Sequence, residues 1–298
     1  MGASLRPICQ IDRGTRHSKG MSRAQVRAVV LALIVVVTVS WSPESGLAQD
    51  MAAAAPGSAS PLTVVSLNLE MREDVGRIVN GIREIGADAA DVLVLQEVVQ
   101  VEGAPDIGSQ IAGSLGLDAA YQSSFKIDGG RNVGLATLSR FPIAHSRALP
   151  LKRFSLIFRS RERSALAVTL DTPSGPLTTY NVHLDTRING GDRVDQVADI
   201  VKDMEAAPGR ALVAGDFNTN ENLWLFHTIP LPFLGRQGSG LERYMASHGL
   251  RSAFERGATH DTLRMRLDWM FLRDLQPIAR AIHPMDISDH HALVVTMR

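Results

Sequence analysis

The residues of this 298-residue chain best suited to chemistry gather in three short motifs. Asp216 and Asn218 stand close together, Asp268 follows further along, and Asp289 directly precedes His290. A carboxylate that accepts a hydrogen bond from an imidazole fixes its tautomer and stabilises its protonated form, which makes histidine an effective general base. Hard oxygen ligands suit Mg²⁺ or Mn²⁺ far better than zinc. The pattern therefore predicts a metal-dependent hydrolase that acts on phosphate esters.

Several apolar, strand-like segments lead directly into polar residues. Three such strands are expected, each leading into one polar side chain: residues 63–68 into Asn68, residues 92–95 into Glu97, and residues 211–214 into Asp216. Strand ends that share one rim of a sheet bring such side chains together on a rigid base. We therefore expect these residues to form one site.

Two amphipathic helices are expected, because apolar side chains recur at intervals of three and four. The first carries Val75, Ile78, Val79, Ile82 and Ile85, and the second carries Val194, Val197, Ala198, Val201 and Met204. A hairpin is predicted from residues 164–170 and 177–183, and further strands from residues 135–138, 267–272 and 292–297. No second linker or repeat interrupts residues 63–298, so we expect one domain there.

Six motifs then stand in the order typical of one family. They are Asn68, Gln96-Glu97, Asn181-Val182-His183-Leu184-Asp185, Gly215-Asp216-Phe217-Asn218, Arg266-Leu267-Asp268 and Ser288-Asp289-His290. Each alone is weak, but together they resemble the endonuclease/exonuclease/phosphatase superfamily, as does the segment 134–143. The resemblance spans residues 63–297. It implies an α/β fold, a four-layer sandwich of two mostly antiparallel β-sheets packed face to face and flanked by helices.

The resemblance also implies a role for each matching residue. Asn68, Glu97 and Asp289 belong to the metal site for Mg²⁺ or Mn²⁺, with Glu97 the principal carboxylate ligand. The catalytic residues are His183, Asp216, Asn218, Asp268 and His290. His183 and Asn218 contact the phosphate, Asp216 orients or activates the attacking water, and Asp268 orients His290, which is a general base or stabilises the transition state. The division of work between Asp216 and His290 stays open.

Two further histidines are also candidates for the site. His291 follows His290 directly, but it begins the last expected strand, so we expect it to face another way. His260 precedes Asp261, and we interpret this pair as polar loop residues, with an accessory role in the site as the alternative.

Two segments bear on the class of substrate, and they favour different classes. Residues 147–163 contain six basic residues and one acid, which suits a polynucleotide or an anionic lipid head group, or else a solvated basic loop. Arg153 in this segment and Arg140 in the family-like segment are our candidates for substrate binding. Residues 223–234 are rich in large apolar side chains and contain two prolines. They either pack over the core or form an exposed lip that touches membrane.

The N-terminal residues read as a targeting segment. Residues 28–41 are almost continuously apolar and follow Arg23 and Arg27, but 14 residues are short for a membrane span. We therefore interpret residues 1–48 as a signal peptide or short N-terminal anchor, and residues 49–62 as a flexible linker. The protein is then exported to the periplasm or secreted, or stays anchored. The only cysteine is Cys9, so residues 63–298 contain no disulfide and no thiolate site.

The chain is electroneutral, but six basic and two acidic residues lie within residues 1–48, which leaves the rest mildly acidic. That balance weakens the prediction of a generic nucleic-acid binder. The sequence thus predicts an exported, monomeric, metal-dependent phosphodiesterase whose substrate is a nucleic acid, a lipid head group or a small molecule. The alternatives are an inactive binding module of the same fold or a narrow phosphomonoesterase.

Overall fold

The protein is described by a computed structural model that covers residues 60–154 and 162–298. The predictions for residues 1–48, for nearly all of the linker, and for Arg159 and Arg161 lie outside the described residues. Among the described helices, none is both long and apolar enough to cross a membrane.

The first of two six-stranded sheets has the strand order β13-β14-β1-β2-β4-β3. Its strands are β1 (Leu62–Asn68), β2 (Val92–Val101), β3 (Asp118–Ile127), β4 (Arg131–Ser139), β13 (Pro277–His283) and β14 (Ala292–Met297). All neighbours pair antiparallel except β1 and β2. The chain therefore closes this sheet with its last strands, which lie beside its first.

The second sheet has the order β11-β12-β8-β7-β6-β5. Its strands are β5 (Ile143–Pro150), β6 (Ser164–Thr172), β7 (Gly175–His183), β8 (Ala211–Asp216), β11 (Arg251–Ser252) and β12 (Asp268–Arg273). Among the described strands of this second sheet, only β7 and β8 pair in parallel. The predicted hairpin is confirmed as β6 and β7.

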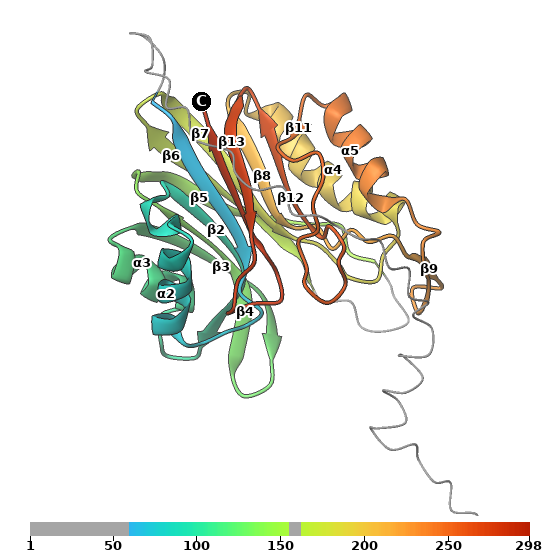
Figure 1. Cartoon of the computed structure of the whole chain (residues 1–298), viewed down its shortest axis with the longest axis horizontal. Helices are drawn as coiled ribbons and strands as arrows, with labels where there is room; N and C mark the ends of the chain where they lie inside the picture. Colours follow the sequence, from blue (N-terminus) through green and yellow to red (C-terminus); the bar gives the residue numbers. More distant parts are fainter. Residues whose placement is uncertain (1–59, 155–161) are drawn as a thin grey trace, which may run out of the picture. The chain divides into compact units, whose positions relative to one another are not determined.

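Helices cover the outer face of each sheet (Figure 1). Helices α2 (Val75–Glu84) and α3 (Ile107–Leu115), with the 3₁₀ turn η1 (Ala87–Ala89), pack on the first sheet, and α4 (Gly190–Ala206) and α5 (Gln237–Ser247) pack on the second. A third apolar cluster fills the space between the sheets. The expected four-layer α/β sandwich with two mostly antiparallel sheets is confirmed.

Strand β12 shows how the sequence encodes these layers. Successive side chains of a strand point to opposite faces. Met270 and Leu272 enter the core between the sheets, whereas Trp269 and Phe271 enter the core under α4 and α5. Because both faces are buried, the strand is a continuous apolar run rather than an alternating one.

Two local details differ from expectation. Strand β2 does not end at Glu97 but continues to Val101 through an irregularity between Leu95 and Val98. Residues 223–231 form a small separate hairpin of β9 (Leu223–Leu225) and β10 (Ile229–Leu231), in spite of Pro230. Proline is tolerated there because a two-stranded hairpin consists only of edge strands.

Candidate active site

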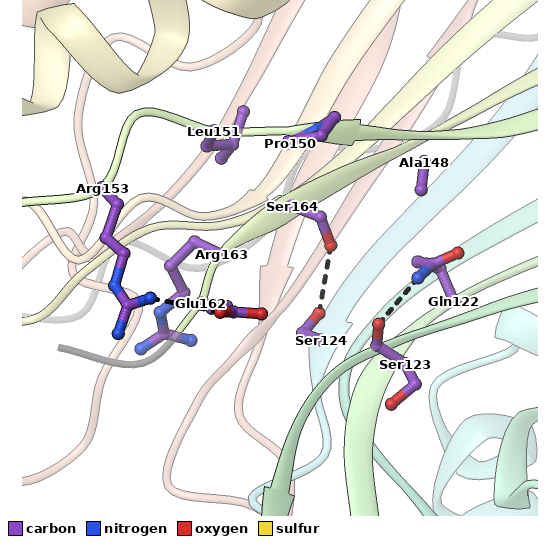
Figure 2. A pocket seen from close by; sticks show the side chains of 10 residues that line it. All are labelled: Gln122, Ser123, Ser124, Ala148, Pro150, Leu151, Arg153, Glu162, Arg163 and Ser164. Carbon is purple, nitrogen blue, oxygen red and sulfur yellow. Dashed lines mark hydrogen bonds and ion pairs between the residues drawn. The ribbon is translucent and has the colours of Figure 1, made fainter. Parts of the chain in front are cut away.

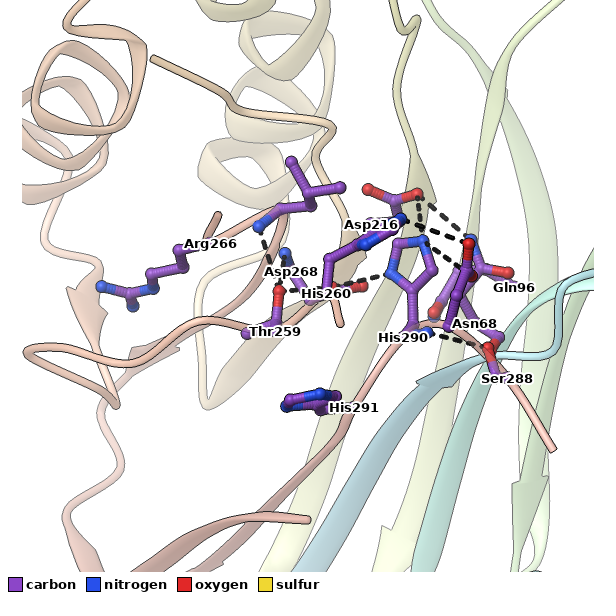
Figure 3. Close-up of polar contacts among 12 residues, drawn as sticks. Asn68, Gln96, Asp216, Thr259, His260, Arg266, Asp268, Ser288, His290 and His291 are labelled. Carbon is purple, nitrogen blue, oxygen red and sulfur yellow. Dashed lines mark hydrogen bonds and ion pairs between the residues drawn. The ribbon is translucent and has the colours of Figure 1, made fainter. Parts of the chain in front are cut away.

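The ends of strands from both sheets meet at one polar cluster (Figure 3). Asp216 ends β8, where it pairs with Asp268 on β12 and with His183 on β7. Asn68 ends β1 of the other sheet, and its Nδ2 donates a hydrogen bond to Asp216 Oδ2 at 3.1 Å. Of the three expected strand ends, Asn68 and Asp216 therefore meet directly, and strand pairing adds His183 and Asp268.

The backbone of the cluster is tightly constrained. Gly215 has φ of 141°, and a Cβ added there would lie 2.1 Å from the carbonyl oxygen of Val182. Only glycine therefore fits before Asp216. Glu97 and Asn218 have φ of 53° and 51°, a left-handed conformation that is uncommon for residues with side chains and concentrates at functional sites. At Glu97 this conformation accompanies the irregularity in β2 and sets the direction of the side chain.

Ser288 fixes the loop that carries His290. Its hydroxyl donates to the carbonyl oxygen of Asn68 at 2.7 Å and accepts from the His290 N–H at 3.1 Å. The His290 ring is buried, and its Nδ1 lies 2.9 Å from Asp268 Oδ2. The hydroxyl of Thr259 donates to the same carboxylate oxygen at 2.6 Å. These bonds hold the histidine and its carboxylate in one arrangement.

The electrostatics favour a protonated His290 in the metal-free site. Burial by itself lowers the pKa of His290, but the charges of Asp268, Asp216 and Asp289, with the hydrogen bond that the ring donates to Asp268, raise it to about 10. His290 Nε2 lies 3.9 Å from both Asp216 Oδ2 and Asp289 Oδ1. Because Nδ1 is bound to Asp268, Nε2 is the nitrogen available for proton transfer.

Asp216 is almost completely buried and accepts several hydrogen bonds. Its Oδ1 accepts from the Asn218 N–H at 2.8 Å, and its Oδ2 accepts from the side chains of Asn68 at 3.1 Å and Asn218 at 3.2 Å. His183 Nε2 lies 3.5 Å from the same Oδ2. Burial raises the pKa of Asp216, and His290 counteracts this. A buried carboxylate surrounded by donors and a histidine is well placed to hold a water molecule.

Glu97 and Asp289 reach the more open side of the cluster. Burial raises the pKa of Glu97, against the charges of His290 and Arg163 and a hydrogen bond from Asn68. Glu97 Oε1 lies 3.8 Å from His183 Nε2, and Asp289 is part-exposed. Carboxylates that crowd together out of water are stabilised by a cation. Two groups of side chains have ligand atoms close enough to share one ion: Asp216, Asp268 and His290, and His260, Asp289 and His290. Asn68 and Glu97 lie beside the first group, through Asp216 and His183. Most of the donors offered here are carboxylate or amide oxygens, which suit Mg²⁺ or Mn²⁺.

His260 joins the cluster, which the sequence pattern gave only as an alternative. Its Nε2 lies 3.3 Å from Asp289 Oδ2, and its ring meets the His290 ring edge to face at 4.9 Å between centroids. The N–H of Leu263 donates to His260 Nδ1 at 3.3 Å, so in the neutral ring the hydrogen lies on Nε2, the nitrogen nearer to Asp289. His291 pairs with Asp261 instead and points away from the cluster, as expected (Figure 3).

A fully buried arginine, which the sequence reasoning missed, ties the loops of the site together. Arg193 of α4 donates to the carbonyl oxygens of Asp185 at 2.5 Å and Phe217 at 2.7 Å, hence to the loops after β7 and β8. Further bonds go to Thr186, Ile188 and Gln237. Burial lowers its pKa to about 9. The sequence contains a signal for it, because Arg193 lies four residues before Val197 and so falls on the buried face of α4.

The two arginines predicted to bind substrate lie in different places. Arg140 follows β4 and contacts Asp91 at 3.6 Å and the Ala90 carbonyl at 3.2 Å. Asp91 precedes β2, whereas Glu97 lies beyond its middle, so Arg140 is at the opposite end of the strand from the cluster. This placement contradicts a role for Arg140 in binding substrate at the cluster. Arg153 lines a pocket between β3 of the first sheet and β5 and β6 of the second (Figure 2).

The described part of the basic segment is neutralised by acids. The ion pairs are Arg147 with Asp203, Lys152 with Asp195, Arg153 with Glu162, and Arg163 with Asp185. Three of the four acids lie outside the segment, on α4 or in the loop before it. The described residues of this segment therefore do not form an unpaired basic surface.

Comparisons with known proteins agree with this fold. The sequence model of the Endonuclease/Exonuclease/phosphatase family matches residues 65–290. The chain belongs to this family. Members of the endonuclease/exonuclease/phosphatase family are generally hydrolases that act on phosphoesters and typically use divalent metals. No curated protein matches the sequence.

Solved structures show the same fold at low sequence identity. An endonuclease/exonuclease/phosphatase from Beutenbergia cavernae DSM 12333 is 21% identical, with a TM-score of 0.65 over 80% of this chain and 71% of that one. The catalytic domain of human Nocturnin with bound sulfate is 20% identical, with a TM-score of 0.58 over 80% and 93%. D. rerio TDP2 complexed with single strand DNA product is 17% identical, with a TM-score of 0.55 over 80% and 100%.

Proposed function

We propose that the protein is an exported phosphodiesterase that hydrolyses its substrate by metal-assisted in-line attack of water. The observation that carries this proposal is the buried Asp268–His290 pair facing Asp216, with Asn68 and Glu97 alongside. A Mg²⁺ or Mn²⁺ ion held by Asn68, Glu97 and the neighbouring carboxylates would neutralise charge on the phosphoryl oxygens.

The side chains of the cluster divide the remaining work. Asp216, held by Asn68 and Asn218, orients the attacking water through its buried carboxylate. His290 moves a proton at Nε2, while Asp268 at Nδ1 keeps the ring in one tautomer and balances its charge. His183 contacts a phosphoryl oxygen from the end of β7. The carboxylates and histidines of this set, Asp216, Asp268, His183 and His290, are all buried, which strengthens their electrostatic effect on the reacting phosphate.

An apolar hairpin beside the cluster favours a lipid phosphodiester over a nucleic acid. The side chains of Phe226, Phe233 and Leu234 are 70%, 82% and 65% exposed. Large apolar groups that stay in water, and are gathered in one loop, typically mark a contact with membrane or protein. This exposure argues against the alternative in which residues 223–234 pack over the core.

The hairpin is fixed to a loop of the site. Asn189, in the loop after β7, donates to the Trp224 carbonyl at 3.0 Å and accepts from the Trp224 N–H at 2.8 Å. His227 Nδ1 lies 2.9 Å from the Arg187 carbonyl in the same loop. The hairpin is therefore held by the loop that follows His183. The described basic residues of the segment 147–163 are paired with acids, so they give no comparable support for a polynucleotide as the substrate.

The test is a comparison of three substrates with Mg²⁺, Mn²⁺ or EDTA: sphingomyelin vesicles, plasmid DNA and bis-p-nitrophenyl phosphate. We expect metal-dependent hydrolysis of the vesicles and of the small diester. Nicking of DNA without action on vesicles would refute the lipid assignment. Folded protein that leaves all three substrates intact would refute the phosphodiesterase and favour a binding module or a narrow phosphomonoesterase.

A further inference from the structure

Strand β2 contains a bulge at the residue that turns toward the cluster. Between Leu95 and Val98, the two residues Gln96 and Glu97 lie opposite a single residue of β4. Such a bulge redirects a side chain, and bulges are common next to active sites. Glu97 has its left-handed conformation here, and a residue with a side chain keeps that conformation only where the surrounding structure holds it. The bulge therefore needs a support.

Asn181, on β7 of the second sheet, reaches across to this bulge. Its Nδ2 donates to the carbonyl oxygens of Leu95 and Ala136, both at 2.9 Å, and these two residues form the last regular pair before the bulge. Its Oδ1 accepts a hydrogen bond from Gln96 Nε2, also at 2.9 Å, within the bulge itself. The side chain of Asn181 thus bonds to both strands that form the bulge and to the residue before Glu97.

The orientation of the Asn181 amide follows from its partners. Carbonyl oxygens only accept hydrogen bonds, so the nitrogen of Asn181 must face them, which leaves its oxygen for Gln96. Gln96 Nε2 also donates to the Val94 carbonyl at 3.1 Å, and Gln96 lies beside Asn68 at the edge of the cluster (Figure 3). Asn181 and Gln96 are both completely buried. Removing the amide of Asn181 therefore leaves buried acceptors without a donor.

The same strand leads from Asn181 to the other half of the cluster. Side chains two residues apart on a strand share a face, so Asn181 and His183 both point between the sheets. His183 pairs with Asp216 on β8, and its Nε2 lies 3.8 Å from Glu97 Oε1. The bonds of Asn181 therefore tie the strand that carries His183 to the strand that carries Glu97, one level below the cluster.

We propose that Asn181 is a positioning residue of the site, which holds the bulge in β2 and so keeps Glu97 in the conformation that presents its carboxylate to a divalent ion. The inference rests on the proposed role of Glu97 in holding that ion. Both hydrogens of Asn181 Nδ2 are used in bonds to the backbone, and its Oδ1 is used by Gln96. Its effect on the ion therefore runs through Glu97.

Calorimetric titration of the full chain with Mn²⁺, without substrate, tests this role. Asn181→Thr and Asn181→Ser each keep one hydroxyl donor, but neither can bond to both carbonyls and to Gln96. We expect each folded variant to bind Mn²⁺ about tenfold more weakly than the wild type, as loss of a residue that orients a metal ligand typically does. Wild-type affinity in either folded variant would overturn the proposal. Loss of the fold in both would assign Asn181 to stability alone, and would also overturn it.

A double-mutant cycle tests the route through Glu97. Glu97→Gln removes the carboxylate on which the bulge acts, so adding Asn181→Thr to it should change Mn²⁺ affinity by less than about twofold. A loss of about tenfold in both backgrounds would mean that Asn181 acts independently of Glu97, and this result would contradict the proposal.

Thr179→Val is the matched control for the loss of a buried polar group. Thr179 lies two residues before Asn181 on the same face of β7, is completely buried, and donates only to the Val168 carbonyl of its own sheet, at 3.4 Å. Thr179→Val should bind Mn²⁺ as the wild type does, whatever it costs in stability toward urea. Equal weakening in this control would refute a specific role for Asn181.

Hydrolysis assays separate this inference from the proposed function. If Mn²⁺ binding follows these predictions but bis-p-nitrophenyl phosphate and sphingomyelin vesicles stay intact, the proposed function fails and the role of Asn181 stands. If the wild type hydrolyses them with Mn²⁺ but folded Asn181→Thr binds Mn²⁺ as tightly as the wild type, only the role of Asn181 fails.

Discussion

Asp268→Asn removes one charge from the cluster while it preserves the shape of the side chain. Thr259 Oγ1 accepts hydrogen bonds from the N–H groups of Leu267 and Asp268, both at 3.0 Å, so its own hydrogen must go to Asp268 Oδ2. In the variant this hydrogen holds the amide oxygen of Asn in the same position. The oxygen still accepts from His290 Nδ1, now as a neutral acceptor. The substitution therefore isolates the effect of the carboxylate charge.

The magnitude follows from the strength of a charged hydrogen bond. A bond to an ionised partner contributes about 1.5–3 kcal/mol, against roughly half that for a neutral one. The variant keeps the neutral bond, so it loses the difference, about 0.8–1.5 kcal/mol, which at about 1.4 kcal/mol per pKa unit lowers the His290 pKa by about half a unit to one unit. If the transition state needs the charged pair, the same energy lowers kcat by about 4- to 12-fold.

Two measurements and one control check this prediction. NMR titration of metal-free protein follows the His290 ring, whose pKa in the wild type is about 10. Hydrolysis of bis-p-nitrophenyl phosphate at saturating Mn²⁺ gives kcat. Asp261→Asn is the matched control, because Asp261 pairs with His291 at 2.6 Å outside the cluster. Wild-type kcat in Asp268→Asn, or an equal loss in Asp261→Asn, would refute the assignment of the Asp268–His290 pair to catalysis.

Three other predictions concern stability and surface. Arg193→Met should lower the free energy of unfolding, measured in urea, by about 3–5 kcal/mol, because it leaves buried carbonyls without donors. Arg273→Met, at a more exposed arginine, should lower it by about 1 kcal/mol. Equal losses would contradict the role of Arg193. Metal-free protein should lose stability as pH rises from 6.5 to about 10, because a raised pKa gives His290 a stabilising contribution that is complete below 6.5 and lost through 10. His290→Gln should flatten this slope, and an unchanged slope would assign it to other groups. Serine in place of both Phe226, in the hairpin, and Phe233, just after it, should weaken vesicle binding by at least fivefold. Ile278→Ser, also apolar and 48% exposed but on β13, should not, and equal effects would exclude residues 223–234 as the membrane contact.

The sequence predicts the cluster well because its chemistry is local. Strands that end in Asn68 and Asp216 are visible as apolar runs followed by polar residues, and hydrogen-bonded sheets bring such ends together. The order of the motifs indicated the family, and the family implied the layers of the fold. The position of Asp268 opposite Asp216 depends on strand pairing, and only the structure shows that register.

The failures come from properties that short motifs do not carry. Arg140 belongs to the family-like segment 134–143. It directly follows the nine-residue strand β4, at the end of that strand that lies away from the cluster. The motif by itself does not show which end of the strand faces the site. The exposure of Phe226 and Phe233 also escapes the sequence, since apolar loops usually pack inward. The pairing of the basic segment was readable in part, because Asp195, Asp199 and Asp203 recur at helical spacing on α4.

Metal dependence of the cluster is the central claim, and Glu97→Gln tests it most directly. Hydrolysis of bis-p-nitrophenyl phosphate is followed as a function of Mn²⁺ concentration, alongside calorimetric binding of Mn²⁺ to the same preparations. We predict that wild-type turnover appears with Mn²⁺ binding and is abolished by EDTA, and that Glu97→Gln weakens binding and turnover together by at least tenfold while the fold is retained. Wild-type turnover that persists in EDTA, or a Glu97→Gln variant that binds Mn²⁺ and turns over as the wild type does, would contradict the account.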